Sequence, residues 1–295
     1  MRQIATLVWV FALTIGVSNP VRAKTLHVVA SFSILADVVK QIGGSSVAVK
    51  GLVPPDGDPH EFEPTPDDAR ALKEADIAFL SGEGLESWFQ RLANASGFKG
   101  EAVVVSTGID TISMEEDGKA VTDPHVWNSA RNVIVWANNI EKALSAASPE
   151  DAAVFRANAK GYAKQLEELD SYARVRIAAI PQEKRKVLTS HDAFGYFSRA
   201  YGVSFLSPIG LSTESEASAG DVGRLIDQIK KEGVKVYFIE NSNDPRLVQQ
   251  IAAATGAKPG GKLYVESLSS GDGPARTYTA MFRYNVDQIV AAISK

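Results

Sequence analysis

The 295-residue sequence contains no cysteine and only four histidines. The lack of cysteine excludes disulfides, thiolate metal sites and thiol nucleophiles, so a metal site would have to use imidazole and carboxylate ligands. Beyond residue 23 there is no apolar run of ~18 residues, and no transmembrane helix is expected there. The 45% apolar composition is that of a folded globular protein.

The first 23 residues have the pattern of a removable secretion signal. Arg2 charges the start, Ile4–Val17 is mostly apolar, and Val21–Ala23 supplies a small-x-small cleavage pattern. We therefore expect a periplasmic protein. Removal of residues 1–23 leaves 29 of the 31 basic residues against 35 acidic ones, a net charge of about −6, which argues against nucleic acid as a partner.

Short apolar runs then alternate with amphipathic stretches, a pattern that predicts an α/β fold with mostly parallel sheets covered by helices. The predicted strands of the first half are Leu26–Ala30, Val47–Val53, Ile77–Leu80 and Val103–Val105, and the predicted helices are Ile34–Ile42 and a segment beginning at Pro66.

The second half repeats this order, which indicates two similar lobes. Ser31–Gly43 aligns without a gap on Ser190–Gly202, and Leu263–Val265 matches Val103–Val105. Between the halves, helical sequence runs from Pro149 to Pro181, where proline stops it. We expect an N-terminal lobe over 24–148, one long rigid linking helix over 149–181 and a C-terminal lobe over 182–295. Two helices broken at Gly161 are the alternative.

Three histidines lie in loops among turn-forming or polar residues. His60 and His125 each follow an Asp-Pro pair, and His191 directly follows the predicted strand Val187–Thr189. The repeat adds a fourth position, because the segment after Val265 begins with Glu266.

These four positions come two from each half, and ligands of open α/β sheets bind beyond the carboxyl ends of the strands. All four could therefore face one cleft. Three imidazoles and one carboxylate suit a divalent transition metal. The remaining histidine, His27, alternates with Val29 inside a predicted strand and is expected to be structural.

Several motifs in order resemble the periplasmic or surface binding proteins of zinc and manganese ABC transporters, the cluster A-I solute-binding proteins, also called the TroA-like or ZnuA-like family. The resemblance covers essentially the whole chain after residue 23. The segments that carry it are Asp58–Pro64, Asp123–Trp127, His191–Phe197, Arg199–Gly202, Glu214–Ser218, Glu240-Asn241, Leu263–Leu268, Gly273–Ala275, Thr277-Tyr278 and Asn285.

The resemblance implies two α/β lobes joined by a rigid long helix, with one metal ion between them and no enzymatic activity. It places the ligand role on His60, His125, His191 and Glu266. The family usually has Asp at the last position, so the longer Glu is a departure, and Asp272 is a nearby substitute. The implied partner is an ABC permease with a cytoplasmic ATPase, and we expect a monomer.

The ligand set favours Zn²⁺, because imidazole suits zinc whereas Mn²⁺ favours oxygen-rich sites. Manganese-binding members typically have a carboxylate at the position of His191. Mn²⁺ remains the alternative, since Ser113–Thr122 lacks the histidine-rich insertion of many zinc-specific relatives. A zinc hydrolase with Asp192 or Glu61 as general base is the rival from another class. Four protein ligands would leave no position for an activated water, and no HExxH motif is present.

Overall fold

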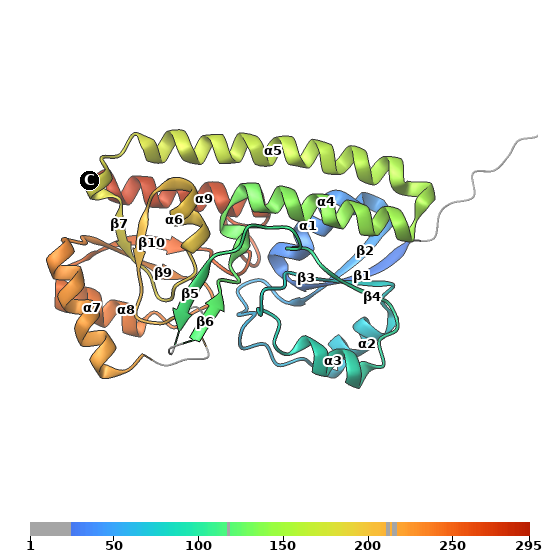
Figure 1. The fold of residues 1–295 in the computed structure, drawn as a ribbon, viewed down its shortest axis with the longest axis horizontal. Helices are drawn as coiled ribbons and strands as arrows, with labels where there is room; N and C mark the ends of the chain where they lie inside the picture. The colour runs from blue at the N-terminus through green and yellow to red at the C-terminus, as the bar shows by residue number, and fades with distance from the viewer. Residues whose placement is uncertain (1–24, 117–118, 211–212, 214–216) are drawn as a thin grey trace, which may run out of the picture.

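The computed structural model describes residues 25–116, 119–210, 213 and 217–295. The predicted signal, residues 1–23, lies outside the described residues. The predicted α/β class is confirmed: two four-stranded sheets, with parallel pairing throughout, form two lobes that lie side by side (Figure 1).

The first lobe contains the sheet β2-β1-β3-β4. Helix α2 shows how local sequence sets an element: Thr65 and Asp68 form a capping box, and Pro66 stands in the first turn, where a missing N–H costs nothing. The elements of this lobe are β1 (Leu26–Phe32), α1 (Ser33–Gly43), β2 (Val47–Val53), α2 (Pro66–Glu74), β3 (Ile77–Leu80), α3 (Phe89–Ser96) and β4 (Glu101–Val104).

The second lobe contains the sheet β8-β7-β9-β10, and so its strands take the same spatial order as their counterparts in the first lobe. This agreement supports the repeat inferred from the sequence. The elements of this lobe are β7 (Lys186–Leu188), α6 (Gly195–Tyr201), β8 (Ser204–Leu206), α7 (Ala219–Glu232), β9 (Val236–Glu240), α8 (Arg246–Thr255), β10 (Lys258–Leu263) and α9 (Tyr278–Ile293).

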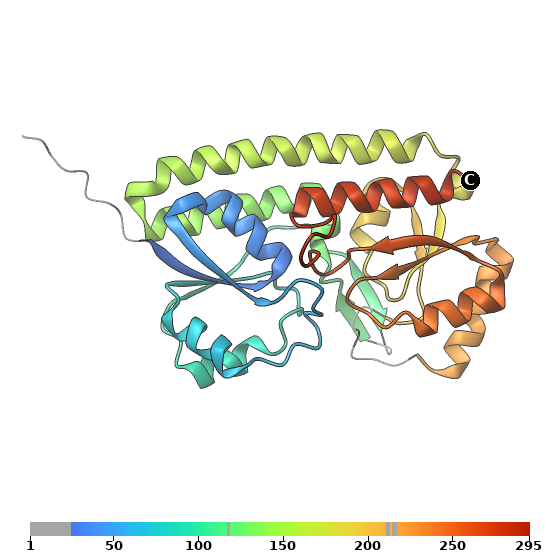
Figure 2. The same ribbon diagram turned by 180° about the vertical axis from the view of Figure 1, so that it is seen from behind.

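A layer of three helices lies along one side of both lobes (Figures 1 and 2). Helix α5 (Ala152–Ala178) runs the length of the molecule, and α4 (Ala130–Ala147) and α9 lie beneath it. The helix α5 is unbroken at Gly161, so the two-helix alternative is wrong. One buried apolar cluster extends through this layer into both lobes, which ties the lobes together away from the cleft.

Parts of the strand assignment differ from the sequence prediction. Strand β4 spans Glu101–Val104, whereas the predicted strand was Val103–Val105. Strand β10 ends at Leu263, whereas the predicted strand was Leu263–Val265. The register of β10 shifts between Pro259 and Gly261. This Pro-Gly-Gly run is typical of a loop, but an edge strand tolerates it. A hairpin of β5 (Ser113–Glu116) and β6 (Lys119–Thr122) also lies between β4 and the His125 segment. No helix within the described residues is long and apolar enough for a membrane span.

Candidate metal centre

His60 lies in the loop that follows β2, and it is 7% exposed. The loop is fixed at two points next to the histidine. The Asp58 carboxylate accepts a hydrogen bond from the His60 backbone N–H (2.8 Å), and the Trp88 indole donates to the Pro59 carbonyl (2.9 Å). The Nε2 of the His60 ring points toward His125 Nε2, which lies 3.2 Å away.

His125 is fully buried, and Asp123 orients its ring. Asp123 Oδ1 accepts hydrogen bonds from both the backbone N–H and the ring Nδ1 of His125, each at 2.9 Å. Because a carboxylate only accepts, Nδ1 carries the hydrogen and Nε2 is free to act as a ligand. A Cβ at position 195 would lie 2.3 Å from Asp123 Oδ2, so Gly195 is needed for this carboxylate to fit.

His191 follows β7 and is held in the same manner by a residue from a neighbouring strand. Glu240, the last residue of β9, accepts from His191 Nδ1 at 2.6 Å. Its other oxygen accepts from the backbone N–H groups of Ser190 and His191 at 2.8 and 3.2 Å. The His191 Nε2 therefore also points toward the other histidines as a candidate ligand atom, 3.4 Å from His125 Nε2.

Glu266 stands three residues beyond β10 and is fully buried. Its Oε1 lies 2.7 Å from His60 Nε2, 3.2 Å from His125 Nε2 and 3.4 Å from His191 Nε2. Its Oε2 is buried and has no hydrogen-bond partner among the described residues. A bound cation would supply the partner that this buried carboxylate oxygen lacks.

The four candidate ligands form one compact group, with donor atoms all within 4.8 Å of one another. A metal held tetrahedrally at about 2.0–2.1 Å places neighbouring ligand atoms about 3.3 Å apart. The Nε2 atoms of His60 and His125 lie 3.2 Å apart, and those of His125 and His191 lie 3.4 Å apart. The group therefore fits a four-coordinate divalent ion after small adjustments.

The pKa shifts of His125, His191 and Glu266 indicate how these side chains are protonated before a metal binds. Burial would lower the pKa of both His125 and His191, but the nearby carboxylates outweigh burial: Asp123 and Glu266 raise the pKa of His125, and Glu240 and Glu266 raise that of His191 well above 6.5. Burial would raise the pKa of Glu266, yet contacts with the imidazoles hold it well below 4.5. The raised pKa values of His125 and His191 favour the protonated rings, so an incoming metal ion competes with protons for their Nε2 atoms.

The other residues considered from sequence lie elsewhere. Asp272 is exposed and outside the group, so Glu266 is the acid brought to the histidines. His27 is exposed on β1. Glu61 is also exposed, and Asp192 is half-buried and not one of the four grouped residues.

Sequence reasoning missed the orienting acids Asp123 and Glu240. The two Asp-Pro-His segments have one local pattern but different contacts, since Asp58 binds the backbone of its histidine and Asp123 binds the ring as well. Glu240 is identified from the sequence only as part of the Glu240-Asn241 motif, which does not indicate its contact with His191.

Comparisons with known proteins agree with the resemblance in the sequence. The family "Zinc-uptake complex component A periplasmic" matches residues 28–292. The metal ABC transporter substrate-binding lipoprotein SloC of Streptococcus mutans is 33% identical over 98% of this chain and 96% of its own length. The manganese-binding lipoprotein MntA of Halalkalibacterium halodurans is 34% identical over 92% and 89%.

Two solved structures are similar to the fold. The periplasmic zinc binding protein TroA from Treponema pallidum has a TM-score of 0.86 at 33% identity, covering 92% of this chain and 100% of that chain. The Mn-bound periplasmic metal binding protein from Candidatus Liberibacter asiaticus has a TM-score of 0.82 at 31% identity, and the match covers 90% of this chain and 98% of that chain.

Proposed function

Because the chain belongs to the family of periplasmic zinc-uptake components, we propose that it captures a divalent transition metal between its lobes and delivers it to an ABC permease for import. The chain is a substrate-binding component and not an enzyme. The proposal rests on the buried group of His60, His125, His191 and Glu266, whose donor atoms lie within 4.8 Å of one another.

The preferred cargo in this proposal is Zn²⁺. Three imidazole nitrogens and one carboxylate oxygen form a set that zinc accepts in tetrahedral geometry. The oriented Nδ1–H groups of His125 and His191 make both Nε2 atoms better ligands, because their carboxylate partners raise the basicity of the rings.

Mn²⁺ is the second candidate, because relatives at similar identity bear manganese in their names. The unpartnered Glu266 Oε2 would let the carboxylate bind through both oxygens and raise the coordination number, which suits the more oxygen-rich shells of manganese. A competitive titration decides between the two ions. Tighter binding of Zn²⁺ than of Mn²⁺ is expected, and the reverse order would transfer the assignment to manganese.

The site itself is tested by metal analysis of four variants, His60→Ala, His125→Ala, His191→Ala and Glu266→Gln. Each should retain less metal than the unaltered protein after dialysis against limiting Zn²⁺. His27→Ala is the matched control, because this histidine is exposed on β1 and lies outside the group. Equal metal content in all five variants would refute the site.

For location and partners, we place the chain in the periplasm, opposite a permease whose ATPase is cytoplasmic. The proposal of a cleaved signal rests on residues 1–23. Relatives are named lipoproteins, but none of the 295 residues here is a cysteine to take a thiol-linked lipid. One chain supplies all four ligands, which is consistent with a monomer as the working form.

A further inference from the structure

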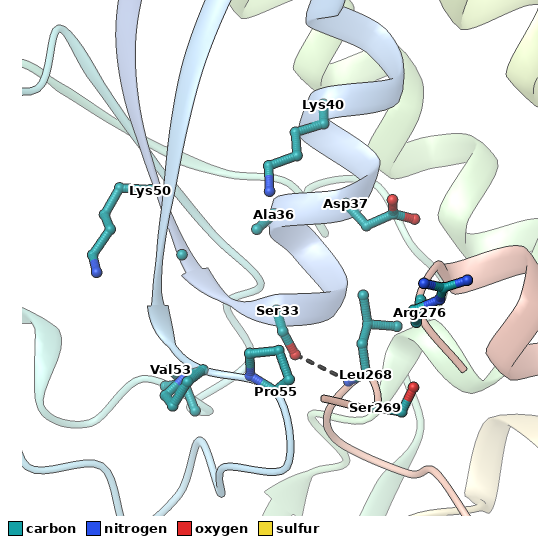
Figure 3. A pocket seen from close by; sticks show the side chains of 12 residues that line it. Ser33, Ala36, Asp37, Lys40, Lys50, Val53, Pro55, Leu268, Ser269 and Arg276 are labelled. Atoms are coloured by element: carbon teal, nitrogen blue, oxygen red, sulfur yellow. Dashed lines mark hydrogen bonds between the residues drawn. The ribbon is translucent and has the colours of Figure 1, made fainter. Parts of the chain in front are cut away.

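Besides the four ligand residues, a set of hydrogen bonds crosses from one lobe to the other beside the metal site. The backbone of Leu268, two residues after Glu266, is held on both sides by the N-terminal lobe. Its N–H donates to the Ser33 hydroxyl at the start of α1, and its carbonyl accepts from the Asp56 N–H, both at 3.0 Å. Figure 3 shows the contact of Ser33 with Leu268.

The Asp56 side chain extends this contact. One carboxylate oxygen accepts from the Asn241 amide and the other from the Ser270 backbone N–H, each at 3.0 Å. Partial burial would raise the pKa of Asp56, but these hydrogen bonds lower it, so the carboxylate is charged at neutral pH. Asp56 and Ser33 together thus make four hydrogen bonds to the segment that carries Glu266 and to Asn241 beside it.

The backbone of Asp56 has the left-handed conformation, which is uncommon for a residue other than glycine. The Gly57 N–H donates to the Pro54 carbonyl, and Asp56 lies at the third position of this turn with φ 59°. Glycine is favoured at such a position, because a side chain makes the left-handed conformation unfavourable. Local turn chemistry therefore favours a glycine at position 56, whereas the contacts across the lobes require an aspartate.

The contact between the lobes borders a pocket on this side of the molecule. The pocket, of about 340 Å³, opens between the lobes and is lined by Pro55 and Lys50 from the first lobe and by Ser269 and Arg276 from the second (Figure 3). The hydrogen bonds of Asp56 and Ser33 join the lobes at the edge of this pocket, at Leu268 and Ser270, two and four residues after Glu266.

We propose that Asp56 is a positioning residue, a clasp that holds the Glu266 segment against the His60 loop and slows metal release. The inference rests on the proposed function, since release is the step that follows capture. His60 and His125 belong to the first lobe, and His191 and Glu266 to the second. Separation of the ligands therefore requires the clasp to open, and its loss should speed dissociation more than association.

The first test is the Zn²⁺ dissociation rate of Asp56→Gly, measured by stopped-flow transfer to an excess of chelator. Glycine removes the carboxylate and relieves the left-handed backbone, so this variant is expected to fold. Release should become roughly tenfold faster, because the variant loses both hydrogen bonds that the carboxylate accepts, each of which contributes modestly at an exposed position. Asp272→Gly is the control, as it removes an exposed acid of the same C-terminal segment; its rate should be unchanged.

A swapped pair tests whether the contact itself matters. Asn241→Asp alone puts two carboxylates face to face and should also speed release. Combined with Asp56→Asn, it restores an amide opposite a carboxylate, while the new Asn oxygen still accepts from Ser270. The double variant should recover most of the slow release. Unchanged release in Asp56→Gly, or no recovery in the double variant, would overturn the clasp.

A second readout does not depend on metal. The chain has no cysteine, so Lys73→Cys in α2 and Lys230→Cys in α7, both at exposed positions, can carry two spin labels on opposite lobes. In metal-free protein, Asp56→Gly should lengthen or broaden the distance distribution between the labels. Failure of the unaltered protein to bind either Zn²⁺ or Mn²⁺ would refute the proposed function alone, whereas identical distance distributions in the unaltered protein and in Asp56→Gly would refute the clasp.

Discussion

Replacement of Asp123 by Asn should weaken metal binding although the residue touches no metal. Asp123 Oδ1 lies 2.9 Å from both the ring Nδ1 and the backbone nitrogen of His125, and both side chains are fully buried. Loss of such an orienting carboxylate lowers metal affinity by about 10- to 100-fold, which corresponds to roughly 1.4–2.7 kcal/mol. Competition with a chromophoric zinc chelator at pH 7.5 measures the change.

Asp123→Asn should also alter the pH dependence of metal affinity. Asp123 is among the groups that raise the pKa of His125 against the effect of burial, so its neutralisation lowers that pKa and weakens proton competition. The difference in affinity between Asp123→Asn and the unaltered protein should therefore narrow as the pH falls from 7.5 to 5.5. A difference that widens, or an affinity equal to that of the unaltered protein at pH 7.5, would refute the reasoning.

Asp58→Asn is the matched control for this experiment. It removes the acid from the other Asp-Pro-His segment, but within the described part of the chain the Asp58 side chain has hydrogen bonds only with the backbone N–H of His60 and the Thr213 hydroxyl. The ring of His60 should keep its orientation, so the loss of affinity should be smaller than for Asp123→Asn. A larger loss for Asp58→Asn would show that removal of charge, and not ring orientation, controls binding.

Four further predictions concern pH, packing and metal preference at the same site. Zn²⁺ affinity of the unaltered protein should fall as pH decreases, starting above 6.5, because the pKa values of His125 and His191 are raised; titration calorimetry in buffers of different ionisation enthalpy should also detect proton release on binding. In the metal-free protein these two histidines stabilise the fold at low pH, and this effect is lost as the pH rises through their raised pKa values. Glu266 stabilises the fold above its lowered pKa. The melting temperature should therefore have a maximum at a pH between these limits. Gly195→Ala should weaken metal binding in the same chelator assay, because the new methyl group would displace Asp123; an unchanged affinity would contradict that packing. The pair His191→Glu with Glu240→Gln should lower the preference for Zn²⁺ over Mn²⁺ in a competitive titration, since it replaces an imidazole by an oxygen ligand and removes the acid that would repel it.

The sequence predicted the fold best where local pattern and tertiary environment agree. Val47–Val53 and Ile77–Leu80 are strands with the predicted bounds. Leu52, Val53 and residues 77–79 are buried in the first lobe, and Val47 and Val49 are half-buried. Prediction was wrong for β10, whose Pro-Gly-Gly run has loop propensity and is paired only because it lies at a sheet edge. The strands of the β5–β6 hairpin are short and, among the described residues, pair only with each other; nothing in their sequence pattern predicted them.

The candidate ligands could be predicted because metal chemistry restricts residue type and because strand ends converge in space. The orienting acids could not be assigned in the same manner. Glu240 lies 49 residues from His191, and the contact depends on how β9 pairs beside β7. Sequence spacing contains no information on such a contact until the sheet order is known.

The two Asp-Pro-His segments show why a motif alone does not determine a role. In both, the aspartate accepts from the backbone N–H of the histidine two residues later, a local contact that the short spacing itself permits. Only Asp123 also reaches the ring, because it is fully buried and lies against Gly195 in the second lobe, whereas Asp58 turns its other oxygen to Thr213. The second lobe therefore decides which aspartate tunes a ligand, and the identical local sequences acquire different functions through contacts that cross the cleft.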